Sequence, residues 1–174
     1  MLVGEFCAAL VEELPEKSIP QEYDLYGWLI GSWDFEWFYD RGTEQERRIP
    51  GEWFFAWIIA GQAIQDVFIC PSREYRERHT LPEAEYGTTI RLYDPRRKVW
   101  EMTYCTKGGF EIFDVRKDPA TGEVIQQCIT SEGFYMRWSF DEIASDSFHW
   151  SNSISRDEGK TWELLGELFA RRRG

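Results

Sequence analysis

Large apolar side chains occupy every second position in several stretches of the chain. Three such runs are Trp33, Phe35, Trp37 and Tyr39; Trp53, Phe55 and Trp57; and Trp100, Met102 and Tyr104. Because successive side chains of a β-strand point to opposite faces, each run places its large side chains on one face of a strand. The repeated pattern predicts the apolar interior of a β-sandwich or a β-barrel.

Segments of this kind continue to the end of the chain and are separated by short turns rich in Gly, Asp and Pro. They predict ten strands, over residues 28–40, 51–59, 62–70, 86–93, 99–106, 110–116, 123–130, 134–140, 147–155 and 161–170. Short connections between neighbouring strands are typical of hairpins. We therefore predict an all-β fold, a single antiparallel up-and-down β-barrel of about ten strands, because closure removes the unpaired edges of an open sheet.

The N-terminal part of the chain has a different pattern. Val3 to Leu14 predicts a short helix that Pro15 and Pro20 end. Residues 1–24 are then a leader that covers a barrel mouth, joins a dimer or frays, and residues 25–174 form the barrel domain.

No further helix is expected after Trp28, and Pro71 to Glu85 is predicted to be a long polar loop. The inside and outside of each strand depend on its register, since one bulge moves every later residue to the other face. Pro50-Gly51 is the expected place for such a break.

The aromatic content changes the picture from a plain core to a container. The chain has nine Trp, eight Tyr and twelve Phe in 174 residues. Each buried ring removes roughly 150–250 Å² from water, so a solid core of this size cannot hold them all. We expect some of them to line a cavity, a rim or a subunit interface.

The net charge of −11 argues against a nucleic-acid partner, because phosphates need clustered Lys and Arg and the only basic cluster is Arg171 to Arg173. The chain has no signal peptide and no apolar run long enough for a membrane span, so no membrane partner is expected. Cys7, Cys70, Cys105 and Cys128 lack metal-finger spacing and are expected to be reduced thiols. These features predict a cytoplasmic protein.

The start of the first strand contains Gly31-Ser32-Trp33, a G-x-W motif. It resembles the motif that opens the first strand of lipocalins and of the wider calycin group. Together with later segments such as Arg91 to Pro95 and Arg137 to Phe140, the series from about Leu25 to Arg172 is similar to a bacterial family of lipocalin-like domains of unknown function. The resemblance implies that Trp33 plugs the closed end of the barrel and that Arg171 or Arg172 packs over it, and it implies no activity.

The segment Ser155 to Trp162 matches S-x-D-x-G-x-T-W, the Asp-box of sialidase propellers. It occurs once, in a chain too short for a propeller, so we assign it a structural role as a hairpin. In that hairpin Asp157 accepts hydrogen bonds from turn amides, Gly159 takes a positive φ and Trp162 packs under the turn.

A barrel pocket is mostly apolar and carries a few polar groups that orient its ligand. The candidate ligand-binding residues are Trp37, Trp53, Trp57, Arg91, Trp100, Tyr104 and Arg137. Arg91 and Arg137 suit a two-pronged contact with a ligand carboxylate. The alternatives are that each arginine pairs with an internal carboxylate or lies outside, and that the rings are simple core.

The chain offers little for metal or cofactor chemistry. It has two histidines: His79 lies in the polar loop, and His149 faces outward if Trp150 faces inward. A haem site of the nitrobindin type needs a histidine that reaches into the barrel, and no His/Cys cluster is present. Neither a cofactor nor a metal is therefore expected.

Three functional hypotheses remain. The first is a barrel that binds a small apolar or amphipathic molecule. The second is an enzyme of the cyclase or isomerase type, in which Arg91, Tyr104 or an inward Asp or Glu supplies the acid–base step. An inward carboxyl whose pKa is raised by burial would favour it. The third is a non-catalytic protein whose excess rings form a homodimer face.

Overall fold

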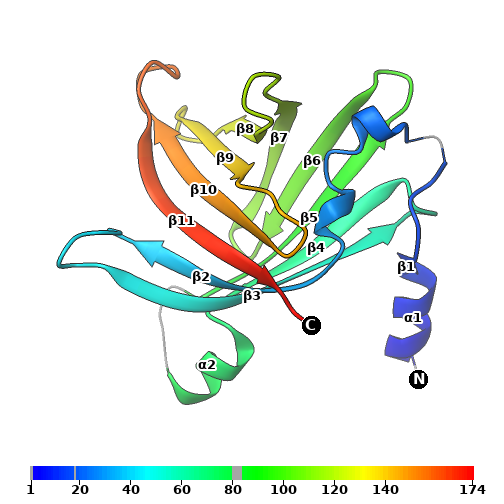
Figure 1. Cartoon of the computed structure of the whole chain (residues 1–174), viewed down its shortest axis with the longest axis horizontal. Coiled ribbons are helices and arrows are strands. Elements are labelled where there is room, and N and C mark those ends of the chain that lie inside the picture. The colour runs from blue at the N-terminus through cyan, green and yellow to red at the C-terminus, as the bar shows by residue number, and fades with distance from the viewer. Residues whose placement is uncertain (1, 18, 80–83) are drawn as a thin grey trace.

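Ten antiparallel strands follow one another around a closed barrel (Figure 1). The computed structural model describes residues 2–17, 19–79 and 84–174. The barrel strands are β2 (Gly31–Tyr39), β3 (Arg47–Ile58), β4 (Ala63–Cys70), β5 (Glu85–Asp94), β6 (Val99–Thr106), β7 (Gly109–Lys117), β8 (Val124–Ile129), β9 (Tyr135–Asp141), β10 (Ser147–Ser155) and β11 (Glu163–Arg172). Each pairs with the next along the chain, and β11 pairs with β2 to close the barrel. The predicted all-β, up-and-down barrel of about ten strands is confirmed.

The N-terminal helix is shorter than predicted. It is α1 (Leu2–Leu10), and the chain then forms the two-residue strand β1 (Val11–Glu12), which pairs with the end of β3. The predicted extension of the helix to Leu14 is wrong, because Val11 and Glu12 pair with Ile58 and Trp57 of β3 instead. This part of β3 lies beyond its pairing with β2, which ends at Gly31. Residues 4–9 of α1 are exposed.

A second short helix, α2 (Arg73–Arg78), lies in the segment predicted to be a loop. The Ser72 hydroxyl caps it by accepting a hydrogen bond from the Tyr75 amide at 3.3 Å. Arg73 ties the helix to the barrel, since its guanidinium Nε and Nη2 each lie 2.9 Å from a carboxylate oxygen of Glu52. Both α-helices lie outside the barrel wall (Figure 1). Residues 80–83 of the predicted loop, with Pro82, lie outside the described residues.

The predicted break at Pro50-Gly51 is absent from the described pairing, because β3 keeps one register with β2 through both residues. The Pro50 carbonyl accepts a hydrogen bond from the Ser72 amide at 2.7 Å, so this carbonyl faces the start of α2 rather than β2. Proline is tolerated where its missing N–H faces away from a partner strand. The register shift lies instead in the β10–β11 pairing, where Asn152 pairs with Gly166 and Ser153 with Leu164.

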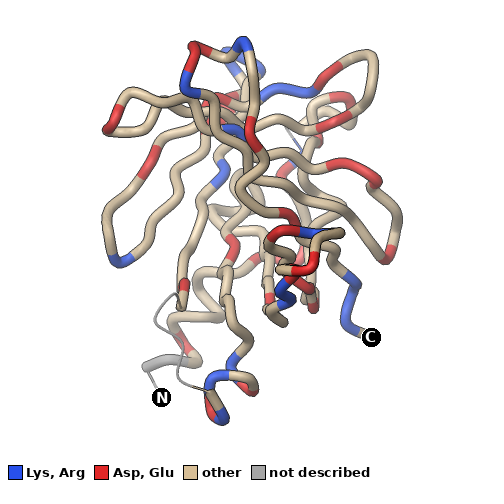
Figure 2. Tube along the Cα trace, turned by 90° about the vertical axis from the view of Figure 1, so that its left-hand side faces the viewer, with Lys and Arg blue, Asp and Glu red and all other residues tan. Residues whose placement is uncertain are grey.

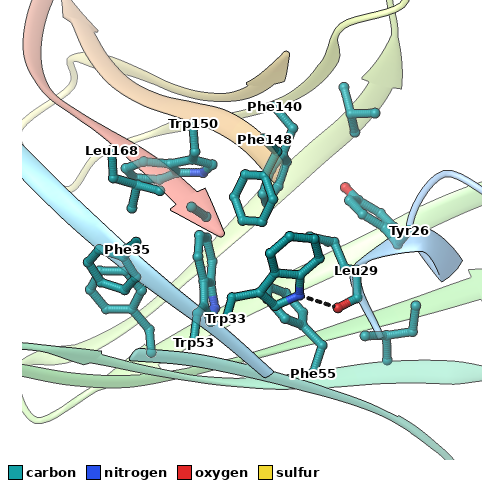
Figure 3. Packing of buried hydrophobic residues seen from close by; sticks show 14 of the residues in the cluster. Tyr26, Leu29, Trp33, Phe35, Trp53, Phe55, Phe140, Phe148, Trp150 and Leu168 are labelled. Carbon is teal, nitrogen blue, oxygen red and sulfur yellow. Dashed lines mark hydrogen bonds between the residues drawn. The ribbon is translucent and has the colours of Figure 1, made fainter. Parts of the chain in front are cut away.

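The alternating rings fill the barrel interior. Figure 3 shows Trp33, Trp53, Phe55 and Phe148 gathered in the middle, with Tyr26 and Leu29 at one side. The rings pack mainly edge to face; Trp33 and Phe148, for example, have centroids 4.8 Å apart at an interplanar angle of 69°. The period-two pattern therefore becomes one continuous aromatic core.

One end of the barrel is closed by the chain that precedes β2. This segment contains two 3₁₀ helices, η1 (Gln21–Tyr23) and η2 (Gly27–Leu29). The Trp100 indole donates a hydrogen bond to the Tyr23 carbonyl at 2.6 Å, and the Trp33 indole donates to the Leu29 carbonyl at 2.6 Å. Residues 19–30 therefore belong physically to the closed end, while the predicted domain boundary after residue 24 stays a prediction.

Arg172 packs against the closed end and stabilises it. Its guanidinium lies 4.2 Å from the Trp33 ring centroid and donates to the carbonyls of Trp28 at 2.6 Å and Ile30 at 2.7 Å. Gly31 has φ +126°, and a Cβ there would lie 2.9 Å from the Arg172 guanidinium. A glycine is needed at this position because its backbone conformation and the approach of Arg172 leave no room for a side chain.

The Asp-box segment forms the β10–β11 hairpin. Asp157 accepts hydrogen bonds from the amide and hydroxyl of Thr161, which lower its pKa to about 2. Gly159 has φ +86°, and the Trp162 indole donates to the Gly159 carbonyl at 3.1 Å. The segment has the geometry of a structural turn.

Charged residues are spread over the outside of the barrel. Figure 2 shows Asp and Glu on turns and strands around the molecule, interspersed with Lys and Arg. No helix in the described part of the chain is long and apolar enough to cross a membrane.

Candidate functional site

The end of the barrel opposite η1 and η2 contains a cavity of about 550 Å³. Its rim comes from the β6–β7 and β8–β9 turns, at Gly108, Gly109 and Ser131. A volume of this size falls within the range of about 300–1,000 Å³ that is typical of small-molecule sites. The cavity therefore marks the candidate functional site.

Seven aromatic side chains line the cavity, and one of them, Phe110, is mostly exposed at its rim. We call the other six the aromatic wall: Trp37, Trp53, Phe68, Tyr104, Trp138 and Trp150. Trp150 lies at its centre, with ring centroids 5.5 Å from Trp37, 5.9 Å from Trp53 and 5.5 Å from Trp138. Trp138 continues the contact to Tyr104 at 5.0 Å. The wall is a connected layer in which each ring limits the movement of its neighbours.

A glycine on β11 makes room for one of these rings. A Cβ at Gly166 would lie 2.5 Å from Cζ2 of Trp37. The Trp37 indole therefore packs directly against the β11 backbone at Gly166.

We expect Gly166→Ala to push the Trp37 indole away from β11. Overpacking of this kind costs about 1–3 kcal/mol. Urea unfolding of the variant measures the loss, and Gly122→Ala is no suitable control because of its φ of +78°. Gly108→Ala is suitable, since nothing lies within 4 Å of a Cβ there. Equal stability of the Gly166 and Gly108 variants would contradict the packing described.

The polar part of the lining centres on a carboxyl and a phenol. Glu85 is the first residue of β5, and the Tyr104 hydroxyl donates a hydrogen bond to its carboxylate. Burial raises the pKa of Glu85. Other polar lining residues are Thr89, Thr106, Glu111, Ser131 and Asn152.

The raised pKa of Glu85 gives stability a pH dependence of known sign. The folded protein binds this proton more tightly than the unfolded chain does, so Glu85 favours folding at acidic pH, and that contribution is lost as pH rises through its folded-state pKa. We expect Glu85→Gln to gain stability relative to the parent protein as pH rises from about 4 to about 8. Urea midpoints across this range measure the difference; a difference that stays constant or falls would show that the carboxyl is not desolvated.

Arg91 belongs to a buried network deeper in the barrel. Its guanidinium forms an ion pair with Asp66 and donates to the Gln126 side-chain carbonyl at 3.3 Å, and both charged side chains are at most 1% exposed. The Asp66 carboxylate also accepts from the Thr89 amide at 3.1 Å. Arg91 therefore pairs with an internal carboxylate, as in the alternative that the sequence left open, and not with a ligand carboxylate.

The predicted ligand-binding residues divide into two groups. Trp37, Trp53 and Tyr104 line the cavity. The others do not: Trp57, Arg91 and Trp100 are buried in or near the closed half, and Arg137 stacks on Trp162, with its guanidinium carbon 3.8 Å from the ring centroid. Strand alternation places Arg137 on the face opposite Trp138. None of these four residues is therefore part of the candidate site.

Several lining residues were not predicted, notably Trp138, Trp150 and Glu85. Met136, Trp138 and Phe140 alternate along β9 in the same way as the earlier runs, so the sequence contained a signal for Trp138 that the neighbouring Arg137 obscured. Glu85 was missed because the strand that contains it was predicted to begin at Tyr86.

The two histidines take no part in the cavity. His149 is half-buried in β10 and hydrogen-bonds with Asp141 at 2.7 Å and Glu167 at 2.8 Å. His79 stacks on Tyr75 at the end of α2. Among the described residues no group of three or more His, Cys, Asp or Glu side chains is arranged to hold a metal ion.

Comparison with known proteins supports the fold alone. No protein-family model matches the chain, and no curated protein matches it either. Among solved structures, the chain is similar to Rv2717c from M. tuberculosis, with a TM-score of 0.52 and 11% sequence identity over 92% of this chain and 99% of that one. The chain is thus a ten-strand antiparallel β-barrel with a structural neighbour of the same extent.

Proposed function

We propose that the barrel binds a small apolar or amphipathic molecule in the cavity at its open end. The observation that carries the proposal is the 550 Å³ cavity with its aromatic wall. A solid core would have closed this space with side chains, because protein interiors pack as densely as organic crystals. Instead, large rings surround a volume that suits a ligand, and a few polar groups lie at its edge.

Intrinsic tryptophan fluorescence tests this proposal, because four indoles line the cavity. A panel of fatty acids, terpenoids, aromatic acids, aromatic amines and haem is titrated into the protein. We expect at least one class to change the emission in a saturable way. A panel without any saturable change would contradict the proposal.

A matched pair of variants assigns the binding to the cavity. Thr106 lines it, whereas Thr103 lies on the outer face of the same strand, β6. We expect Thr106→Phe to weaken binding at least about tenfold and Thr103→Phe to leave it unchanged. Equal weakening by both variants would place the ligand elsewhere.

One observation favours an enzyme of the cyclase or isomerase type as a second candidate. Glu85 and Tyr104 form a hydrogen-bonded pair at the cavity, and the pKa of the carboxyl is raised by burial. A carboxyl with a raised pKa suits general acid–base work near neutral pH. Mass spectrometry of a bound ligand after incubation in D₂O tests this: deuterium uptake or rearrangement that Glu85→Gln abolishes supports it, and recovery of unchanged ligand contradicts it.

Lipocalin-like, calycin-group membership is part of the proposal. It is supported by the Gly31-Ser32-Trp33 motif at the start of β2 and by Arg172 over Trp33. The four free cysteines favour a reducing, cytoplasmic setting.

A homodimer is the third candidate, supported by exposed apolar side chains that do not line the cavity, such as Ile112 of β7 at 66% and Ile129 of β8 at 58% exposure. Light scattering after size exclusion decides it, since a monomer at micromolar concentration contradicts a strong self-interface.

A further inference from the structure

The acidic and basic residues that line the cavity are all acidic. They are the carboxylic acids Glu85 and Glu111, and no Lys, Arg or His occurs among the described residues that line it. The two arginines expected to meet a ligand carboxylate are engaged elsewhere, Arg91 with Asp66 and Arg137 with Trp162. Among the described residues, the lining therefore offers no cationic side chain to balance an anionic ligand.

The aromatic wall adds to this preference. The faces of Trp, Tyr and Phe rings carry negative electrostatic potential and attract cations, most strongly for Trp. Four of the six rings are indoles, and their Nε1 atoms are buried, with less than 1 Å² of each accessible and no hydrogen-bond partner among the described residues. A ligand in the cavity thus meets the carbon surface of the indoles and not their N–H donors.

Two cationic residues lie close to the lining in the chain or in space, Lys107 in the rim turn between Thr106 and Gly108 and Arg76 of α2, and neither is among the lining residues. Arg76 of α2 donates its hydrogen bonds to the backbone carbonyls of Cys70, Pro71 and Glu85, and its guanidinium is not part of the lining. Within the described part of the chain, the Glu85 carboxylate accepts a hydrogen bond from the Tyr104 hydroxyl and forms no ion pair. No cationic side chain among the described lining residues neutralises it.

We propose that the cavity selects organic cations, that is, a compact apolar or aromatic group that carries an ammonium nitrogen, with the nitrogen between the aromatic wall and Glu85. This inference rests on the proposed binding function and names the chemical class of its ligand. A cation would offset the cost of the buried carboxylate, whose pKa is raised by burial in the free protein. The quaternary or protonated nitrogen needs no hydrogen-bond donor from the protein, in agreement with the buried indole nitrogens.

Three compounds that share a 2-naphthylmethyl group and carry different end groups test the proposal: (2-naphthylmethyl)trimethylammonium, 2-naphthylmethanol and 2-naphthylacetate. Isothermal titration calorimetry in about 0.15 M salt, which limits the Debye length to about 8 Å, reduces the effect of the overall net charge. We expect the cation to bind at least about tenfold more tightly than the alcohol, and the carboxylate to bind most weakly.

Variants then assign the preference to the cavity. We expect Glu85→Gln to lower the ratio of cation to alcohol affinity by at least about fivefold, with Glu111→Gln as a second cavity variant should the first fail to fold. Asp114→Asn is the matched control, because Asp114 is exposed on the outer face of β7. The inference would be overturned if Asp114→Asn lowered the ratio of cation to alcohol affinity as much as Glu85→Gln and Glu111→Gln do.

The outcomes separate this inference from the proposed function. If the alcohol or the carboxylate binds as tightly as the cation, and Thr106→Phe weakens that binding, the cation preference is overturned. The proposed binding of a small molecule in the barrel then still stands. Failure of all three compounds, together with the broader panel, overturns the binding function itself.

Discussion

Replacement of Arg91 by Met is expected to lower the free energy of unfolding by about 3–5 kcal/mol. The substitution leaves the Asp66 carboxylate without its cationic partner at a position with 0% exposure. An isolated buried charge is costly because the protein interior solvates it far less well than water does. Urea unfolding at neutral pH measures the loss.

Two further variants assign this loss to the buried pair. Asp66→Asn combined with Arg91→Met is expected to recover a substantial part of the stability, because an amide at position 66 can still accept from the Thr89 amide and carries no charge. Arg97→Met removes an exposed ion pair with Glu101 and is expected to cost less than about 1 kcal/mol. An Arg91→Met loss as small as that of Arg97→Met would contradict the buried network.

The second large effect is expected from Trp33→Ala, which should cost about 3–5 kcal/mol. Trp33 is completely buried at the closed end and contacts the rings of Trp28 and Phe148. Its removal leaves a cavity and also takes away the ring over which Arg172 lies. Thermal or urea unfolding measures the cost.

The control for this variant is Phe110→Ala, because Phe110 is 66% exposed. Surface substitutions usually change stability by no more than about 0.5 kcal/mol. Arg172→Met is expected to give an intermediate loss of about 1–3 kcal/mol, because it leaves the carbonyls of Trp28 and Ile30 without their donor. A Trp33→Ala loss below that of Arg172→Met would contradict the role of Trp33 as the plug.

Strand alternation explains why so much of the barrel could be predicted. The rings of β2, β3 and β6 recur with a period of two, and that period survives folding because each strand must place one face in the core. Helix α2 could not be predicted in this way, since six residues are too few to show a helical period. Its position depends on the contact between Arg73 and Glu52, which are 21 residues apart.

The site was harder to predict than the fold. Alternation identifies which side chains of a strand point inward, but it does not tell which end of the barrel they occupy. Trp57 and Trp53 lie on the same face of β3, yet only Trp53 lines the cavity. The partner of Arg91 likewise depends on the pairing of β4 with β5, which brings Asp66 beside it.

The central claim is that the open end of the barrel holds a small molecule against the aromatic wall. A crystal structure of the protein with the tightest-binding compound of the naphthalene series tests it most directly. The predicted result is density for the naphthalene ring between Trp37, Trp138 and Trp150, with its end group beside Glu85. A cavity filled by its own side chains, or density for the compound on the outside of the barrel, would contradict the claim.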